Sequence, residues 1–178
     1  EMAGELAEFD PAAIERKLPG RAMETKADSG WKWPELEDIG PDAGPGARAE
    51  RDALKLLAAF VQHGDSKAAN QRLLCPKGEQ VGQTGCGRPV LMVQDLGLTF
   101  GHAGLANKND DSVSLATWAK LPVWKDRERC VAQQKRSFTG SLSHPQIHEA
   151  GRAFLAGLLV QLSDAQLRGL FEAARVDR

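Results

Sequence analysis

Two short polar runs, HGDSKAAN at residues 63–70 and QDLG some twenty residues later, constrain this chain more than any other feature. They place two acids, an amide and a lysine in the order that magnesium-dependent phosphate transfer requires. Asp65 can accept a proton from an attacking hydroxyl, and Lys67 can neutralise charge on the phosphoryl group in transfer. Asn70 and Asp95 carry hard oxygen atoms that suit Mg²⁺ bridging nucleotide phosphates.

The residues around these runs predict a helix followed by a β-hairpin. Apolar residues recur at helical spacing from Arg48 to Gln62, so a helix should lead into the first run. Residues 71–75 and 90–93 are short and β-favouring, and a Gly-rich polar stretch separates them. Such a hairpin would bring Asn70 and Asp95 from its two ends into one cluster.

The pattern H-x-D-x-K-x-x-N, then a hydrophobic strand, then D-x-G, resembles the catalytic and metal-binding segments of the protein-kinase-like superfamily. The His-Gly-Asp opening is similar to small-molecule phosphotransferases of the aminoglycoside-kinase type, and the lysine two residues after Asp65 is similar to protein kinases. The resemblance implies Asp65 and Lys67 as catalytic residues. It implies Asn70 and Asp95 as the residues that bind metal and cofactor, with Mg²⁺ and ATP as the cofactors.

The same resemblance implies an α+β fold that is mainly α-helical, in which a small β-hairpin bears the catalytic and metal-binding loops of a kinase-like C-terminal lobe. The chain departs from the pattern, because Leu96 replaces the common Phe and no Ala-Pro-Glu segment follows Gly97. Residues 1–47 offer no phosphate-covering loop and no sheet with a Lys–Glu pair. We therefore expect residues 1–47 to be an N-terminal extension or linker, and residues 48–178 to be the lobe.

We expect the chain to be the C-terminal part of a longer protein, with the missing N-terminal lobe on the same gene product or on another chain. Residues 1–17 look like a short helix, with Asp10 and Pro11 as the cap and first turn for residues 12–18. Trp31 and Trp33 should either anchor the extension on the core or mark the surface that the missing lobe covers.

Composition narrows the class of protein. A chain of 178 residues with 42% hydrophobic content predicts one globular domain. A net charge of −1 argues against a protein built for binding nucleic acid or anionic membranes. No apolar run approaches membrane-spanning length and no signal peptide is visible, so the localisation stays open.

The three cysteines allow several states. Cys75 and Cys86 flank the proposed hairpin loop and could form a disulfide that leaves Cys130 alone, although other pairings and free buried thiols are equally compatible with an odd count. A zinc site that adds His144 and His148 is less favoured, because the spacing matches no closed structural motif.

The C-terminal part predicts two helices that form a hairpin and close the lobe. The first, over residues 146–161, should turn one apolar stripe toward the core: Ile147, Ala150, Phe154, Leu158 and Leu162. Ser163 to Gln166 is a candidate capping box for a second helix, which carries Leu167, Leu170, Phe171 and Ala174. Residues 120–136 are rich in Lys and Arg and should form a helix face or a basic contact for an acidic substrate or partner.

Three classes of function are compatible with these residues. The first is an ATP- and Mg²⁺-dependent phosphotransferase. The second is a pseudokinase or regulatory binding module, which the lack of a phosphate loop favours. The third is a metal-dependent phosphohydrolase using His63, Asp65 and Asp95, disfavoured because the four histidines are scattered.

Asp65, Asn70 and Asp95 could also be ordinary turn residues, Lys67 a surface lysine, and His63 a partly buried histidine with satisfied hydrogen bonds. The acceptor could be a protein hydroxyl, a small molecule or a lipid headgroup.

Overall fold

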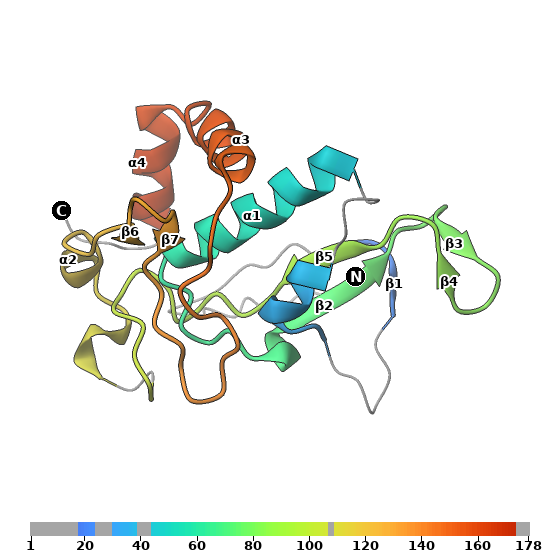
Figure 1. The fold of residues 1–178 in the computed structure, drawn as a ribbon, viewed down its shortest axis with the longest axis horizontal. Coiled ribbons are helices and arrows are strands. Elements are labelled where there is room, and N and C mark those ends of the chain that lie inside the picture. The colour runs from blue at the N-terminus through green and yellow to red at the C-terminus, as the bar shows by residue number, and fades with distance from the viewer. Residues whose placement is uncertain (1–17, 24–29, 39–43, 107–108, 174–178) are drawn as a thin grey trace, which may run out of the picture.

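A central helix lies between a small β-sheet and a second long helix (Figure 1). The computed structural model describes residues 18–23, 30–38, 44–106 and 109–173. The fold is mixed α+β, and its helical elements are η1 (Trp33–Asp38), α1 (Gly44–Phe60), η3 (Ala68–Asn70), η4 (Asp110–Ser112), α2 (Leu115–Trp118), α3 (Glu149–Leu159) and α4 (Asp164–Ala173). The strands are β1 (Arg21–Ala22), β2 (Gln71–Cys75), β3 (Gln80–Val81), β4 (Gly85–Cys86), β5 (Val90–Val93), β6 (Trp124–Asp126) and β7 (Val131–Ala132).

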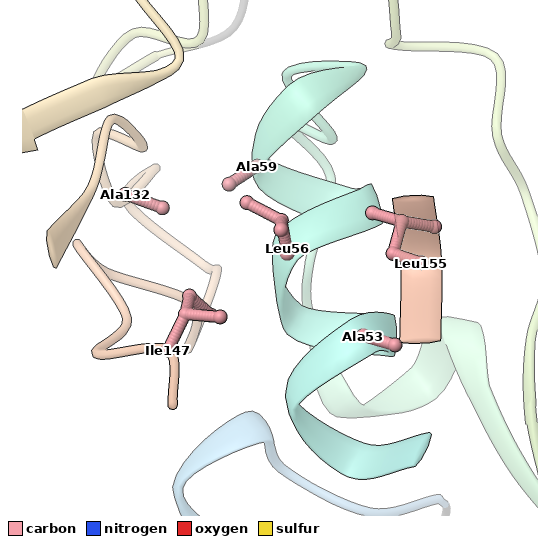
Figure 2. Close-up of a cluster of buried hydrophobic side chains, with 6 residues drawn as sticks. All are labelled: Ala53, Leu56, Ala59, Ala132, Ile147 and Leu155. Carbon is pink, nitrogen blue, oxygen red and sulfur yellow. The ribbon is translucent and has the colours of Figure 1, made fainter. Parts of the chain in front are cut away.

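The helix predicted before the first polar run is present as α1, which begins at Gly44 and ends at Phe60. Its apolar residues divide between two faces because it is covered on both sides. One face packs against β7 and α3 in a cluster that Figure 2 shows: Ala53, Leu56, Ala59, Ala132, Ile147 and Leu155. Ala58, on the other side, belongs to a second cluster that includes both Trp31 and Trp33 and touches the sheet.

The predicted hairpin is confirmed. β2 and β5 pair antiparallel with Gln71 opposite Val93, and β1 adds a third strand on the other side of β2. Because Gln71 and Val93 are opposite each other, the residues that precede β2 and follow β5 emerge at the same end of the sheet. This pairing sets the position of the two polar runs.

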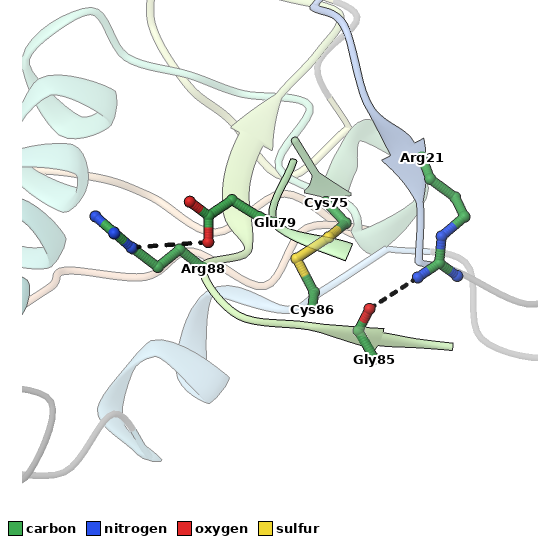
Figure 3. The surroundings of a disulfide bond; sticks show 6 residues. All are labelled: Arg21, Cys75, Glu79, Gly85, Cys86 and Arg88. Carbon is green, nitrogen blue, oxygen red and sulfur yellow. Dashed lines mark hydrogen bonds and ion pairs between the residues drawn. A yellow bond between two sulfur atoms is a disulfide. The ribbon is translucent and has the colours of Figure 1, made fainter. Parts of the chain in front are cut away.

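The long turn of the hairpin carries a second, smaller hairpin of β3 and β4. A disulfide joins Cys75 at the end of β2 to Cys86 in β4 (Figure 3). Of the pairings and free thiols that the sequence allowed, the structure therefore has the Cys75–Cys86 bond, and Cys130 is a free thiol. The Arg21 side chain also donates a hydrogen bond to the Gly85 carbonyl at 3.0 Å. The smaller hairpin is therefore fastened both to β2 and to β1.

The segment before α1 contributes to the core. Trp31 and Trp33 are buried, with 5% and 2% of their surface exposed, so they anchor this segment on the core of the chain itself. The Trp31 indole donates to the Arg72 carbonyl in β2 at 3.0 Å. The helix predicted over residues 1–17 lies outside the described residues.

The predicted core stripe of the first C-terminal helix is wrong, although Ile147 before the helix is buried. The buried residues of α3 are Gly151 and Leu155, whereas Phe154 and Leu158 are 42% and 50% exposed. Gly151 has no side chain, so α3 approaches the backbone of α1 closely along this face. A count of large apolar residues cannot detect a helix face whose contact is made by a glycine.

The predicted capping box of α4 is confirmed. Ser163 Oγ accepts from Gln166 N at 3.2 Å, and Gln166 Oε1 accepts from Ser163 N at 2.9 Å. Its Leu167 and Leu170, however, are 37% and 59% exposed. No helix within the described ranges is long and apolar enough to cross a membrane.

The helix face expected over residues 120–136 is also wrong, because β6 and β7 form a hairpin there. Pro122 lacks the N–H that a helix would need. The Asp126 carboxylate accepts a hydrogen bond from Arg129 N at 3.0 Å, and Cys130 adopts a left-handed backbone with φ of 52°. These two features close a tight turn between the strands.

Candidate functional site

The two polar runs lie side by side at one end of the β2–β5 hairpin. The first run spans the connection between α1 and β2, and the second follows β5. Backbone hydrogen bonds join the two segments in three places: Phe100 N to Val61 O at 2.7 Å, Gly64 N to Leu98 O at 2.9 Å, and Gln94 N to Asn70 O at 2.7 Å. The relative position of the runs is thus fixed by the backbone and does not depend on the side chains of the site.

Asn70 connects the two acids. Its side-chain nitrogen donates to the Asp65 carbonyl at 2.9 Å and lies 3.5 Å from Asp95 Oδ2. Asn70 is buried, the Asp65 side chain is 14% exposed, and Asp95 is exposed. The structure therefore brings the buried Asn70 amide against the backbone of Asp65 and next to the exposed carboxylate of Asp95, while the Asp65 carboxylate is only slightly exposed.

Lys67 lies against the same cluster. Its ammonium is 2.7 Å from Asp65 Oδ2, and its side chain is 38% exposed. An ion pair this accessible to water contributes little to stability. It does hold a positive charge beside the carboxylate, within reach of any group that approaches Asp65.

Buried neighbours fix the backbone of the first run. Ser66 O accepts from Ser141 N at 3.1 Å, and Ser66 Oγ accepts from Leu142 N at 3.3 Å. Gln71 is fully buried; with its amide oriented to satisfy both neighbours, it donates to the Lys67 carbonyl and accepts from Trp33 Nε1 at 2.6 Å. The N-terminal segment thereby supports the loop that carries Asp65 and Lys67.

His63 is buried next to Trp33, with ring centroids 6.2 Å apart. Within the described residues, neither nitrogen of its ring has a hydrogen-bond partner, so the expected satisfied histidine is not found. Burial lowers the pKa of His63, and the charges of Asp65 and Asp95 oppose this shift without reversing it. The pKa of His63 is therefore below its usual value, and the ring is neutral at pH 7.

Asp95 adopts a left-handed backbone with φ of 53°, a conformation that Asp tolerates better than most residues. The turn that follows is closed by Thr99 Oγ1, which donates to Leu96 O at 2.7 Å. Asp95, Leu96 and Gly97 are all exposed. The turn therefore presents the Asp95 carboxylate to solvent instead of burying it in the sheet.

The donor atoms near Asn70 fit Mg²⁺ that also contacts a nucleotide. Mg²⁺ in such sites is bound by one or two carboxylates together with substrate phosphates, and not by a closed protein cage. Asp95 offers an exposed carboxylate, and the hydrogen bonds that the Asn70 side chain makes with the described residues use its nitrogen and not its oxygen. No group of three or more His, Cys, Asp or Glu that could hold a metal occurs among the described residues.

Asp65 also lines an open cavity of about 470 Å³ that sequence reasoning missed. The other lining residues come from the segment after the second run and from a distant loop: Leu98, Leu105, Ala106, Ser137, Phe138 and Thr139. The loop at residues 137–139 lies some seventy positions after Asp65 and carries no motif. Only the fold places it beside the site.

Only the chemistry of Asp65, Lys67, Asn70 and Asp95 and their geometry in this chain can support a proposal about what they do. Comparison with protein families, with characterised proteins and with solved structures found no match.

Proposed function

We propose that this chain is the catalytic lobe of an ATP- and Mg²⁺-dependent phosphotransferase of the kinase-like type. The observation that carries the proposal is the Asn70 amide, which contacts the backbone of Asp65 and lies 3.5 Å from the Asp95 carboxylate. A proton acceptor and a pair of hard oxygen ligands thus lie in one cluster with a lysine.

In the proposed reaction, the hydroxyl oxygen of the acceptor forms a bond to the γ-phosphorus of ATP. The bond from that phosphorus to the bridging oxygen breaks, and ADP leaves with the electron pair. Asp65 accepts the proton of the attacking hydroxyl. Its carboxylate is partly exposed and lines the cavity, so an acceptor hydroxyl can reach it from that side.

Lys67 and the Asn70–Asp95 pair support the charged groups of the reaction. Lys67, 2.7 Å from Asp65, offers its positive charge to the phosphoryl oxygens. Asn70 Oδ1 and the Asp95 carboxylate would hold Mg²⁺, which when bound neutralises charge on the nucleotide phosphates. The three backbone hydrogen bonds between the α1–β2 connection and the segment after β5 keep these groups at fixed separations.

The first test is calorimetric titration of ATP with Mg²⁺ into the full chain. We expect Asp95→Ala to weaken binding at least tenfold, because it removes the exposed carboxylate that would hold the ion. Asp110→Ala is the matched control, since Asp110 is an exposed acid on η4 outside the cluster. Equal affinities for the unchanged chain and Asp95→Ala would contradict the proposed role of Asp95.

A second variant separates binding from transfer. Asp65→Asn keeps the size of the side chain but removes the base, so we expect ATP binding to persist while phosphate transfer falls roughly 10²–10⁴-fold. Binding of ATP by the unchanged chain without any transfer would instead favour a regulatory module that keeps the nucleotide site.

A further inference from the structure

The cavity beside Asp65 has an apolar wall built from two distant segments. Leu105 and Phe138 both line it, and they are 70% and 83% exposed. Phe138 N donates to Leu105 O at 2.5 Å, so a backbone hydrogen bond holds these two residues next to each other. Large apolar side chains that remain exposed at the rim of a cavity are typical of a ligand-binding surface.

The charges around the cavity restrict what could bind there. Asp65 is the one charged residue among the described residues that line it, and its carboxylate is paired with Lys67. An anionic acceptor would be repelled by the Asp65 carboxylate. A polycationic acceptor would find only this one acid in the cavity wall, and that acid is already paired. The remaining polar lining consists of two hydroxyl residues, Ser137 and Thr139. Ser137 Oγ accepts from Gly140 N at 2.9 Å.

We propose that the phosphoryl acceptor is an uncharged alcohol that carries an apolar group next to its hydroxyl. The hydroxyl would reach Asp65, and the apolar group would lie against Leu105 and Phe138. This inference depends on the proposed phosphotransferase function and names the substrate class of the same site. Phe138 is then a specificity-determining residue: it contacts the acceptor but not the transferred phosphoryl group.

Three small probes with the same phenyl ring and different charge test the substrate class. They are 2-phenylethanol (neutral), phenylacetate (anionic) and 2-phenylethylamine (cationic), with ethanol as the probe that lacks the apolar group. Binding to the full chain is followed by NMR of the methyl groups of Leu98, Leu105, Ala106 and Thr139, which line the cavity. We expect 2-phenylethanol to shift these signals with an affinity at least fivefold higher than either charged probe, and ethanol to leave them unchanged.

Variants connect the shifts to the cavity. Phe138→Ala should weaken 2-phenylethanol binding about tenfold, whereas Phe154→Ala should not, because Phe154 is a partly exposed phenylalanine on α3 that does not line the cavity. Unchanged methyl signals with 2-phenylethanol, equal affinity for the three phenyl probes, or equal effects of the two variants would each overturn the inference.

The same variants separate this inference from the proposed function. Asp95→Ala should weaken the binding of ATP with Mg²⁺ at least tenfold and leave the methyl shifts with 2-phenylethanol intact. Failure of ATP binding in the unchanged chain would contradict the proposed ATP and Mg²⁺ site at Asn70 and Asp95. Failure of the methyl shifts in a chain that binds ATP would contradict the acceptor class alone.

Discussion

At the scale of single residues, Gly30 controls how closely the N-terminal segment approaches the first polar run. Its backbone is left-handed, with φ of 79°, and a Cβ at this position would collide with the carbonyl oxygens of Ala68 and Gln71. Both oxygens belong to the backbone and cannot move aside as a flexible side chain would. Gly30→Ala must therefore displace the segment that carries Trp31 or distort the loop that ends at Asn70.

We expect Gly30→Ala to lower the free energy of unfolding by about 3 kcal/mol or more, combining backbone strain with the collision. Urea denaturation measures this change. Gly78→Ala is the matched control, because Gly78 also has a positive φ, of 97°, but a Cβ added there would meet nothing within 4 Å. Strain alone should cost Gly78→Ala about 1 kcal/mol. Similar losses of unfolding free energy in the two variants would show that the backbone around Gly30 moves enough to avoid the collision.

The sequence could predict those residues of the candidate site that lie close together along the chain, but not those that the fold brings in from distant segments. Asn70 and Asp95 were expected to meet because they flank the two strands of one hairpin, and pairing of neighbouring strands is a local property. Phe138 and Leu105 could not be expected at the cavity, because neither belongs to a motif and their contact joins distant segments. The ring of His63 was expected to have hydrogen-bond partners, and nothing in the sequence indicates that both its nitrogens lack them within the described structure.

At the scale of elements, α3 shows why the predicted core face was wrong. The helix itself was expected, but its contact with α1 is made through Gly151, where an added Cβ would collide with the Asp52 side chain and approach the Asp52 and Ala53 backbone at 3.0 and 3.1 Å. Periodicity of large apolar residues therefore identified a helix and assigned it the wrong side. Close approach of two helices depends on small residues, which carry no weight in such a pattern.

This contact predicts opposite effects for two glycines of the same helix. Gly151→Ala should lower the free energy of unfolding by about 1–3 kcal/mol, because the added methyl group forces α3 away from α1. Gly157→Ala should raise it by about 0.5–1 kcal/mol, since Gly157 has nothing within 4 Å of its Cβ position and Ala favours helices over Gly. Thermal or urea unfolding of both variants checks the pair; stabilisation by Gly151→Ala would contradict the close packing of α3 on α1.

At the scale of the whole molecule, a charge network with buried Asp52 and Lys55 at its centre joins three elements that no pattern in the sequence connects. Asp52 in α1 is fully buried, and its carboxylate contacts Lys55 at 2.9 Å and His148 Nδ1, at the start of α3, at 2.6 Å. Lys55 also contacts Glu37 of η1 at 2.6 Å. Asp52 is also paired within α1 with Arg51 at 3.2 Å, and the contacts of this buried pair with His148 and Glu37 tie α3 and η1 to α1.

The network predicts how the stability of the protein depends on pH. Burial alone would raise the pKa of Asp52, but hydrogen bonds from Lys55 and His148 and the charge of Lys55 outweigh it and lower this pKa from 3.8 to about 2. A lowered carboxyl pKa contributes stability that is present above pH 3.8 and is lost as the pH falls toward 2. The contribution of Asp52 is on the order of 2 kcal/mol.

Urea denaturation between pH 6 and pH 2 measures this contribution. We expect the unchanged chain to lose on the order of 2 kcal/mol more over this range than Asp52→Asn, whose side chain cannot titrate. We expect Asp52→Asn to be less stable at pH 6, because it leaves Lys55 buried beside a neutral amide. The quantity to compare is therefore the slope of the unfolding free energy against pH, and not the unfolding free energy itself. Asp110→Asn, at an exposed acid outside the network, should follow the slope of the unchanged chain. If the unchanged chain and Asp52→Asn show parallel pH profiles, then Asp52 has the same pKa in the folded and the unfolded chain. That result would contradict a stabilising contribution of the Asp52 charge to the contact between α1 and α3.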